Sequence, residues 1–412
     1  MDDAGFDGVV GFDEASGRLR DICGPHGRSE TVPVSDADAR VLATGVEARR
    51  AVPHYDRAAM DGYAVRASDT FDASDRSPVT LGMASERVES GAAVPVHTGS
   101  ELPPGADSVV MVEATEERDD ELPVYDTLAV GENVSPAGED VDHGDPLFAA
   151  GHELRPSDLA LLRATGNETV AVVDRPRVSV LPTGEELVPA GVEPGPGEIV
   201  ETNGLLVSTL ADRWGGDSAY RDVVTDDEAA LRAAIQGDTD HDIVVTTGGS
   251  SVGERDLVAE VVDDAGDLLV HGVAISPGHP VGLGVVDGTV VLLLPGYPVS
   301  CLVNAVQFLR PAIAWVSGTD PHPQPSVRGR LTEKLRSEPG ERTFARVSVD
   351  DESGDDLPAV EPIRTSGAGV LSSVTTADGW VEIPESKEGI PAGETVTVQE
   401  WERTDTVPQH SE

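Results

Sequence analysis

The sequence predicts a multidomain protein that combines one α/β domain with two β-rich domains. From residue 175 to residue 318, short apolar strands alternate with helical segments, which is typical of a parallel sheet covered by helices on both faces. Residues 78–135 and 327–398 instead show short β-branched runs separated by Gly and Pro, with little helical periodicity. A chain of 412 residues is long enough for such an arrangement.

The domain limits follow from these changes of pattern. Residues 1–50 and 138–173 carry helical signals on either side of a β-rich stretch, so we expect them to form one discontinuous domain. A β-rich domain is expected over residues 51–137 and the α/β domain over residues 174–318. The Pro-rich segment 319–325 then opens a C-terminal domain, residues 319–402, which we expect to be a small β-barrel.

Acidic residues dominate the composition. Asp and Glu number 75 against 29 Lys and Arg, which gives a formal net charge of −46. Because these charges are spread along the whole chain, they predict adaptation to molar salt, where screening makes self-repulsion tolerable. No basic stripe is present, so duplex nucleic acid and anionic membranes are not expected partners.

The cysteines and the apolar segments bear on the compartment. Cys23 and Cys301 are too few for a disulfide framework or a cysteine metal site. No apolar run reaches about 18 residues, and the N-terminal segment MDDAGFDG lacks the basic and apolar regions of a signal peptide. We therefore expect a soluble, cytoplasmic protein.

The stretch HDIVVTTGGSSVGERD, residues 241–256, is the strongest local sign of a binding site. A β-branched run ends in small residues that permit tight turns, and backbone N–H groups beyond a strand's carboxyl end favour an anion. We expect Asp256 to lie exposed at the rim, where a divalent cation would join its carboxylate to a phosphate. An ordinary polar loop that reverses the chain is the alternative interpretation. The residues expected in the cradle are Gly248, Gly249, Ser250, Ser251 and Gly253.

Several other turns are expected at the same edge of the sheet, because ligands collect at the carboxyl ends of parallel strands. These turns contain Gly184, Asn203, Gly278 and Gly296. Elsewhere the residues leave two interpretations open. Asp61, which precedes Gly62, is explained by residue chemistry as a turn former. Arg346 and Ser373 are the binding candidates of the C-terminal domain, with a structural role as the alternative.

With these motifs the sequence resembles the molybdopterin molybdenumtransferases, the MoeA family that includes the gephyrin E domain. The resemblance covers nearly the whole chain and rests on segments that occur in the family's order: AMDGYAVR (59–66), TG (98–99), VVMVE (109–113), GED (138–140), PTGEEL (182–187), TN (202–203), TGGSSVGERD (247–256) and LPGYPVS (294–300). It implies a homodimer of four-domain subunits, with a discontinuous linking domain, a β-rich domain, a MogA-like α/β molybdopterin-binding domain and a C-terminal β-barrel.

The activity that this resemblance implies is insertion of molybdate, or tungstate, into adenylated molybdopterin, with release of AMP assisted by Mg²⁺. The implied catalytic residues are Asp61, Thr98, Asp140, Glu186, Asp226 and Asp256, of which Glu186, Asp226 and Asp256 would hold the metal. Asp61, Thr98 and Asp140 resemble positions contributed across the dimer interface. The implied cofactor-binding residues are Thr183, Gly184, Asn203, Gly248, Gly249, Ser250, Ser251, Gly253, Pro277, Gly278, His279, Pro295, Gly296, Ser300, Arg346 and Ser373. A molybdopterin adenylyltransferase or molybdoenzymes are the further partners that it suggests.

One turn departs from the family pattern. In the family this turn is Lys-Pro-Gly-Lys-Pro, and the resemblance implies that its two lysines face molybdate or phosphate. This chain has Ser276-Pro-Gly-His279-Pro instead, and Tyr297 replaces the usual Asn. The general scarcity of Lys does not explain this change, since Arg would be the expected substitute, although His279 can still donate a hydrogen bond. A noncatalytic paralogue that binds molybdopterin for storage or delivery is therefore the alternative interpretation. Gephyrin-like scaffolding is a third, which no feature of the sequence supports.

Overall fold

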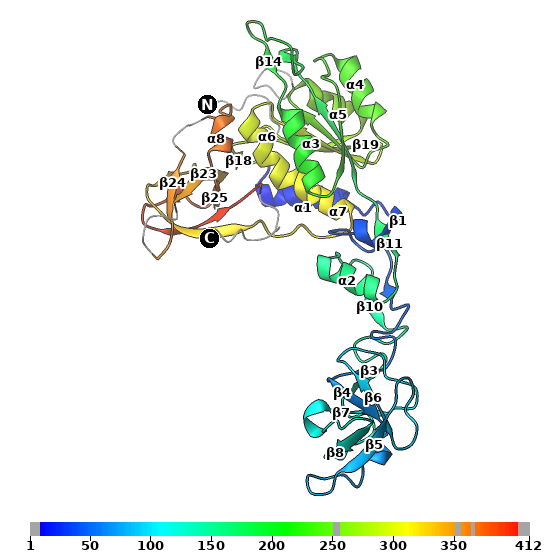
Figure 1. Cartoon of the computed structure of the whole chain (residues 1–412). Helices are drawn as coiled ribbons and strands as arrows, with labels where there is room; N and C mark the ends of the chain where they lie inside the picture. Colours follow the sequence, from blue (N-terminus) through cyan, green and yellow to red (C-terminus); the bar gives the residue numbers. More distant parts are fainter. Residues whose placement is uncertain (1–8, 250–255, 351–355, 364–366, 403–412) are drawn as a thin grey trace. The chain divides into compact units, whose positions relative to one another are not determined.

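The structure, a computed structural model, describes residues 9–249, 256–350, 356–363 and 367–402. The chain divides into two compact units (Figure 1). The first comprises Met1–Arg28 and Asp174–Glu412, and the second comprises Ser29–Val173.

The first unit is built on a six-stranded sheet with the strand order β15-β12-β16-β20-β19-β17. Its strands are β12 (Arg177–Pro182), β15 (Asp217–Tyr220), β16 (Ile243–Thr247), β17 (Asp267–His271), β19 (Gly282–Val286) and β20 (Thr289–Leu294). β15, β12, β16 and β20 are parallel, whereas β19 and β17 continue the sheet antiparallel. Every residue of β16 and β20 is buried, as expected for strands covered on both faces. This confirms the predicted α/β domain.

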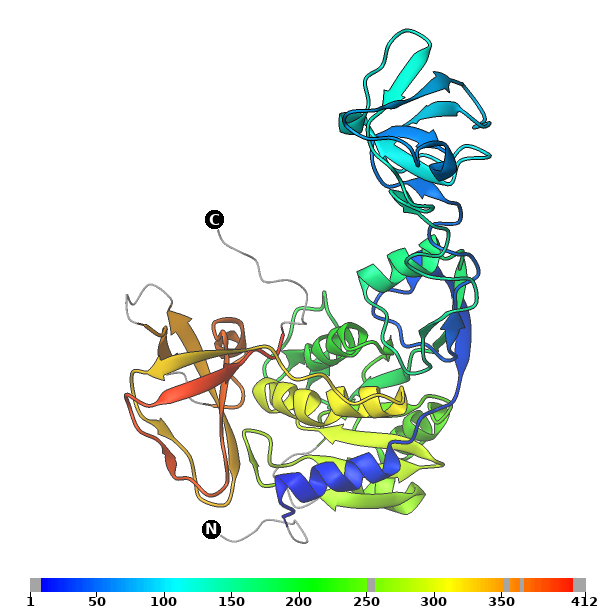
Figure 2. The ribbon, with the colours of Figure 1, turned by 90° about the horizontal axis from the view of Figure 1, so that it is seen from below.

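Helices cover both faces of this sheet. α3 (Asn203–Arg213) and α1 (Phe12–Ile22) pack on one face, and α4 (Glu228–Gly237) and α5 (Leu257–Ala265) pack on the other. Figure 2 shows α1, in blue, alongside the sheet of this unit. Its residues Ala15 and Leu19 are fully buried in the same core as β12 and β16, although we grouped residues 1–50 with the linking domain. Helical periodicity indicates that a helix has an apolar face, but it does not say which domain covers that face.

A long apolar helix runs through this core as α6 (Pro298–Asn304), the π-helical segment η4 (Ala305–Leu309) and α7 (Arg310–Val316). Pro311 lacks an N–H and its ring would clash with a carbonyl in the preceding turn, which accounts for the widened segment just before it. Pro298–Val316 is long and apolar enough to cross a membrane, but 78% of its apolar window is buried inside the protein. Packing in the core therefore accounts for its composition.

The C-terminal strands close into a barrel, as predicted. They are β21 (Ser326–Leu331), β23 (Arg342–Asp350), β24 (Ala359–Pro362), β25 (Gly379–Ile383) and β27 (Thr395–Gln399). The ring runs β23-β24-β21-β27-β25 and returns to β23. β18 (Ile275–Ser276) adds to β23 from outside, and the remaining short elements are β22 (Leu335–Arg336), α8 (Ser372–Thr375) and β26 (Gly389–Ile390). Apolar side chains such as Val347, Val381 and Val398 fill the interior.

The second unit contains a five-stranded sheet with the order β7-β4-β6-β5-β8 and a separate small core. Val34, Leu42, Leu162 and Val172 share that second core, so the two ends of this unit pack together. The remaining limits of the predicted domains stay predictions. The elements are β1 (Ser29–Pro33), η1 (Val34–Asp36), β2 (Val46–Glu47), β3 (Arg57–Ala58), β4 (Gly62–Val65), η2 (Ala67–Asp69), β5 (Val79–Met83), β6 (Ala92–Val96), β7 (Ser108–Met111), η3 (Val112–Ala114), β8 (Glu121–Val124), β9 (Val134–Ser135), β10 (Pro146–Phe148), α2 (Pro156–Ala164) and β11 (Thr169–Val173).

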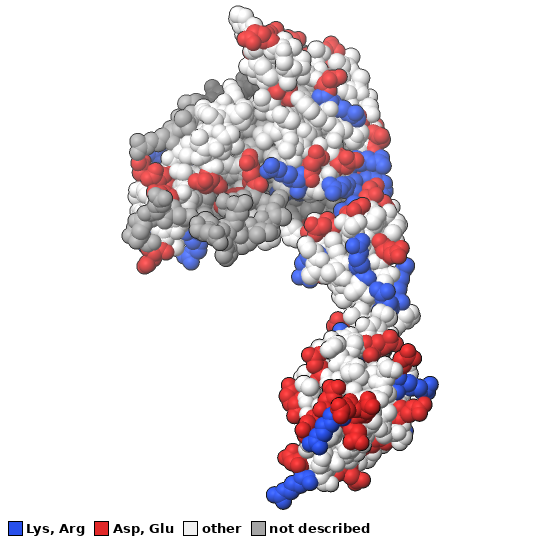
Figure 3. Space-filling view, in the orientation of Figure 1, with Lys and Arg blue, Asp and Glu red and all other residues white. Residues whose placement is uncertain are grey.

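The surface is acidic in both units. Figure 3 shows Asp and Glu side chains spread over the visible face, with fewer Lys and Arg side chains between them. The charge is therefore not gathered in one segment or one patch of that face. This distribution agrees with the even spread along the sequence.

Candidate functional site

The carboxyl ends of the parallel strands bring several predicted turns to one edge of the sheet. Pro182, Thr247 and Leu294 end three neighbouring strands at the same level, because the register pairs Pro182 with Thr247 and Thr247 with Leu294. Gly282 pairs with Leu293 in the antiparallel strand β19, so the turn that precedes β19 lies at this edge as well. The structure therefore places the turns at residues 183–184, 248–249, 276–280 and 295–296 along a single edge.

Glycines let the loops at this edge approach each other closely. Gly248 has φ +131°, and a Cβ there would lie 2.2 Å from the carbonyl oxygen of Thr183. A Cβ at Gly249 would lie 2.4 Å from Cγ2 of Val258. The Gly248 N–H donates to Leu294 O at 3.0 Å, and a Cβ at Gly296 would lie 3.5 Å from Cα of Gly248. A close backbone contact therefore requires glycine at position 248, the Val258 side chain and a positive φ favour it at position 249, and the contact at Gly296 is an ordinary van der Waals one.

Gly248, Gly249 and Gly296 together are called the glycine floor below. Buried oxygen atoms without partners lie around it. Among the residues that the structure describes, Thr183 Oγ1, Thr247 Oγ1 and Asn203 Oδ1 have no hydrogen-bond partner. The amide nitrogen of Asn203 is in use, because it donates to Gly296 O at 2.7 Å. Burying such a group without a partner costs about 1–3 kcal/mol, so these oxygens are hydrogen-bonding capacity that the described residues leave unused. The predicted residues Ser250, Ser251 and Gly253 lie outside the described part of the chain.

Glu201 organises the start of α3, and reasoning from the sequence missed it. Its side chain is 5% exposed and accepts a hydrogen bond from the Gly204 N–H at 2.6 Å. The hydroxyl of Tyr220 donates to its other oxygen, and burial together with this bond raises the pKa of Tyr220 to about 12. An acidic residue two positions before the helix start at Asn203 was the signal available in the sequence. Glu201 fixes the first turn that carries Asn203.

Two acidic residues, Glu186 and Asp226, lie on the loops that follow β12 and β15, and we call them the acidic pair. A bridge between Thr183 and Val224 joins their loops, and the Gly184 N–H donates to Val224 O at 3.3 Å. Partial desolvation and the nearby Glu186 carboxylate raise the pKa of Asp226. Carboxylate oxygens are the ligands that a hard divalent cation prefers, and metal binding by Glu186 and Asp226 stays a prediction.

Asp256 does not lie exposed at the rim as we expected. Its side chain is only 11% exposed, and Oδ1 caps α5 by accepting from the Ala259 N–H at 3.1 Å. Oδ2 lies 3.1 Å from Nε2 of His271 at the end of β17. The expectation was wrong because the residue is the N-cap of a helix, and a cap must fold back onto the first turn.

The three predicted metal ligands do not gather in one group among the described residues. His271, the partner of Asp256, ends β17, which lies four strand positions from β12 in the sheet. At about 4.8 Å between neighbouring strands, the two strand ends are about 19 Å apart. The joint role of Glu186, Asp226 and Asp256 in metal binding stays a prediction.

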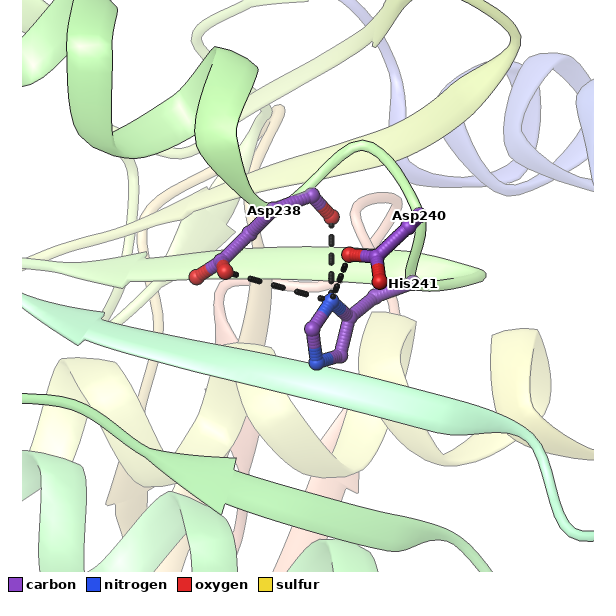
Figure 4. Close-up of side chains that lie close together, drawn as sticks. All are labelled: Asp238, Asp240 and His241. Atoms are coloured by element: carbon purple, nitrogen blue, oxygen red, sulfur yellow. Dashed lines mark hydrogen bonds and ion pairs between the residues drawn. The ribbon is translucent and has the colours of Figure 1, made fainter.

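A different group has the spacing of a metal site at the opposite edge of the sheet. Figure 4 shows Asp238, Asp240 and His241, whose ligand atoms lie within 4.8 Å of one another. Asp238 already accepts two hydrogen bonds from Arg221, at 2.6 and 3.0 Å, and one from Ser179 at 2.5 Å. Because the Arg221 guanidinium neutralises Asp238, and His241 contacts Asp240, ion pairing explains this cluster.

The turn at residues 276–280 is fixed by backbone contacts. The carbonyl oxygen of His279 accepts from the N–H groups of Val273 and Val281, at 3.0 and 2.9 Å. The side chain of Asn304 donates to Gly278 O at 2.9 Å. Tyr297, the other departure from the family pattern, is 62% exposed. The roles of Pro277, Gly278, His279 and Pro295 in binding stay predictions.

The candidates near the barrel are less accessible. Ser373 is buried, and its hydroxyl donates to Val370 O at 2.5 Å, so this hydroxyl joins α8 to the segment before it. Burial lowers the pKa of Arg346, which lies on β23. Ser300 is buried in α6, where its carbonyl oxygen accepts from Asn304 at 2.9 Å. The segment before α8 reaches the start of α6, because Val299 N–H donates to Ala368 O at 3.0 Å. Binding roles for Ser300, Arg346 and Ser373 stay predictions.

In the second unit, two of the predicted residues are bonded to each other. The Thr98 N–H and hydroxyl donate to Oδ1 of Asp61 at 2.7 and 3.1 Å, and these bonds lower the pKa of Asp61. Both side chains are exposed. Asp140 is exposed as well, and its N–H donates to Val52 O at 3.0 Å. These polar groups therefore remain accessible to a ligand.

Known proteins share this organisation along the whole chain. The profile of the MoeA N-terminal region (domain I and II) matches residues 10–166, that described as "Probable molybdopterin binding domain" matches residues 179–315, and that of the MoeA C-terminal region (domain IV) matches residues 328–401. The molybdopterin molybdenumtransferase 2 of Mycobacterium tuberculosis is 34% identical over 92% of this chain and 96% of its own. The molybdopterin molybdenumtransferase of Bacillus subtilis is 31% identical over 94% and 93%. The crystal structure of a molybdopterin biosynthesis MoeA protein from Pyrococcus horikoshii superposes with a TM-score of 0.82 and 34% identity, over 96% of this chain and 100% of that one.

Proposed function

Because the chain belongs to the MoeA family of molybdenum cofactor biosynthesis, we propose that it is a molybdopterin molybdenumtransferase that inserts molybdate, or tungstate, into adenylated molybdopterin with release of AMP. The observation that carries this proposal is the set of buried, unpartnered oxygens around the glycine floor, among the described residues. Thr183 Oγ1 and Asn203 Oδ1 are acceptors suited to the amino and amide N–H groups of a pterin. The small residues let a flat ring system approach the backbone.

The acidic pair beside the floor fits the phosphates of the substrate. Glu186 and Asp226 would hold Mg²⁺, which supplies charge neutralisation on the bridging phosphate while AMP leaves. Thr183 lies between this pair and the glycines, since it bridges to Val224 and contacts Gly248. Asp256 keeps α5 in place through its cap and its contact with His271. Its carboxylate would act on the substrate from the other end of the sheet edge.

The second unit would complete the site in a homodimer. Asp61, Thr98 and Asp140 are exposed polar residues, and the short bonds between Asp61 and Thr98 preorganise a carboxylate and a hydroxyl. We propose that these residues serve the sheet edge of a second copy of the chain. The protein would work in the cytoplasm at high salt, with a molybdopterin adenylyltransferase and molybdoenzymes as its partners; the acidic surface supports the salt adaptation.

One observation favours a second candidate function. The turn with Ser276 and His279 carries no fixed positive charge for molybdate, because neither residue is Lys or Arg. A noncatalytic paralogue would bind molybdopterin at the same glycine floor and store or deliver it without releasing AMP. The two functions thus share a site and differ in turnover.

Incubation with adenylated molybdopterin, Mg²⁺ and molybdate, followed by chromatography of AMP, tests the proposal. Wild type is expected to release AMP, and Asp226→Asn to reduce the rate by roughly a hundredfold or more, because it removes charge stabilisation of a few kcal/mol. Asp240→Asn is the matched control, since its carboxylate is exposed at the opposite edge of the sheet. Binding of molybdopterin without AMP release would favour the paralogue. Absence of both would refute each candidate.

A further inference from the structure

Asn304 is a buried amide at the end of α6, where the helix changes to the π-helical segment η4. Its exposure is 0%, and its amide nitrogen donates to Gly278 O and to Ser300 O, both at 2.9 Å. The orientation of the amide is fixed by these partners, because the reverse orientation would place Oδ1 against two carbonyl oxygens. One side chain therefore connects the long core helix to the turn at residues 276–280.

Packing alone does not explain an asparagine at this position. Its Oδ1 is buried, and no hydrogen-bond partner for it is present among the described residues. A buried acceptor without a donor lowers stability, whereas a leucine would fill a similar space without that cost. The residue is thus explained by what its N–H groups hold, namely the carbonyl oxygen of Gly278.

The turn is fitted to this amide. Gly278 has φ +126°, and a Cβ there would lie 2.4 Å from Nδ2 of Asn304, so only glycine leaves room for the bond. Directly after this glycine, His279 O accepts from the Val273 and Val281 N–H groups, so these two amides report on how firmly the turn is held. Asn304 holds the middle of the turn, between Pro277 and His279.

We propose that Asn304 is a positioning residue for oxyanion binding by the turn at residues 276–280. It sets the peptide groups of Gly278 and His279 without touching the oxyanion itself. Because this turn lacks the two lysines of the family pattern, affinity for molybdate depends more strongly on the exact placement of backbone and imidazole donors. The identity of the oxyanion rests on the proposed function, whereas the positioning of the turn does not.

Hydrogen exchange tests the positioning without any activity. In Asn304→Leu, the Val273 and Val281 amides, which donate to His279 O, are expected to exchange roughly tenfold faster than in wild type, because their acceptor is no longer held. Asn167→Leu is the matched control: Asn167 is also buried, and its amide nitrogen donates to Glu47 O in the second unit at 3.1 Å. Asn304→Asp keeps the shape and loses both donors, so it should accelerate exchange as well. Unchanged exchange at Val273 and Val281 in both variants would overturn the proposal.

Steady-state kinetics then tests the link to the oxyanion. The KM for molybdate should rise roughly five- to tenfold in Asn304→Leu, the factor for one lost hydrogen bond, while the KM for adenylated molybdopterin changes less than about twofold. A parallel rise of both KM values would show general loosening of the site and would contradict the proposal. If exchange is faster but the KM for molybdate is unchanged, the oxyanion does not bind at this turn. AMP release in the same assay would show that the transferase function still stands. If wild type releases no AMP, the transferase function fails. Calorimetric titration of molybdate into wild type and Asn304→Leu then decides the inference, because the Kd of the variant should be roughly five- to tenfold higher.

Discussion

Replacing Asp256 should cost stability as well as activity, because its carboxylate caps a helix. Asp256→Ala removes the acceptor of the Ala259 N–H and the partner of His271. Loss of an N-cap typically costs about 1 kcal/mol, and loss of a partly buried polar contact about 1 kcal/mol more. The expected decrease in the free energy of unfolding is therefore about 2 kcal/mol. Asp256→Asn keeps an oxygen acceptor for the cap and should cost less than about 1 kcal/mol.

Tryptophan fluorescence measures this effect in the relevant unit. All four tryptophans, Trp214, Trp315, Trp380 and Trp401, lie in the unit that contains α5. Denaturant titrations at constant KCl should place the midpoint of Asp256→Ala clearly below wild type, with Asp256→Asn between them. Both variants should lose AMP release, because each removes the carboxylate charge. Equal midpoints for wild type and Asp256→Ala, or equal losses in the two variants, would refute the capping role.

Ion pairing, backbone fit, salt dependence and oligomeric state each give a further prediction. Burial alone would raise the pKa of Asp242, but the Arg28 guanidinium and the Arg177 N–H lower it. The ion pair between Arg28 and Asp242 therefore stabilises the fold above the pKa that Asp242 has in the unfolded chain. This contribution is lost as pH falls through the lowered pKa of the folded state. The stability difference between wild type and Arg28→Met should accordingly be largest above about pH 5 and shrink below about pH 4 in fluorescence titrations; a constant difference would contradict the assignment. Gly248→Ala places a Cβ 2.2 Å from Thr183 O at φ +131°, so it should lower the free energy of unfolding by about 1–3 kcal/mol, and a neutral result would count against the close approach. Unfolding midpoints should rise steeply with KCl because 75 acidic side chains repel at low ionic strength, whereas a flat profile would argue against salt adaptation. Sedimentation at high salt should give twice 43.0 kDa, and a fully active monomer would rule out a site shared between subunits.

The parts of the fold that depend on local pattern were predictable from the sequence. β16 and β20 consist of β-branched and apolar residues and lead into Gly-containing turns, and the C-terminal strands alternate with clear turn signals. The domain to which α1 belongs was not predictable in this way, because its apolar face is covered by segments far along the chain. Local patterns give the elements, whereas the assignment of faces depends on contacts between distant residues.

The same distinction holds for the site. Register places the turns at 183–184, 248–249 and 295–296 on one edge, and the alternation of strands and helices was sufficient to predict this. The exposure of Asp256 was misjudged, although an Asp directly before the apolar helical run Leu257–Ala265 is an N-cap signal. Glu201 and Asn304 were missed because their partners, Tyr220 and Gly278, are 19 and 26 positions away along the chain.

The most direct test of the central claim is a crystal structure with adenylated molybdopterin bound. The glycine floor at the carboxyl ends of β12, β16 and β20 should be the binding place, with donors of the ligand within hydrogen-bond distance of Thr183 Oγ1 and Asn203 Oδ1. Its phosphates should lie on the side of Glu186 and Asp226. A ligand bound elsewhere, with these two oxygen atoms still unpartnered, would contradict the account.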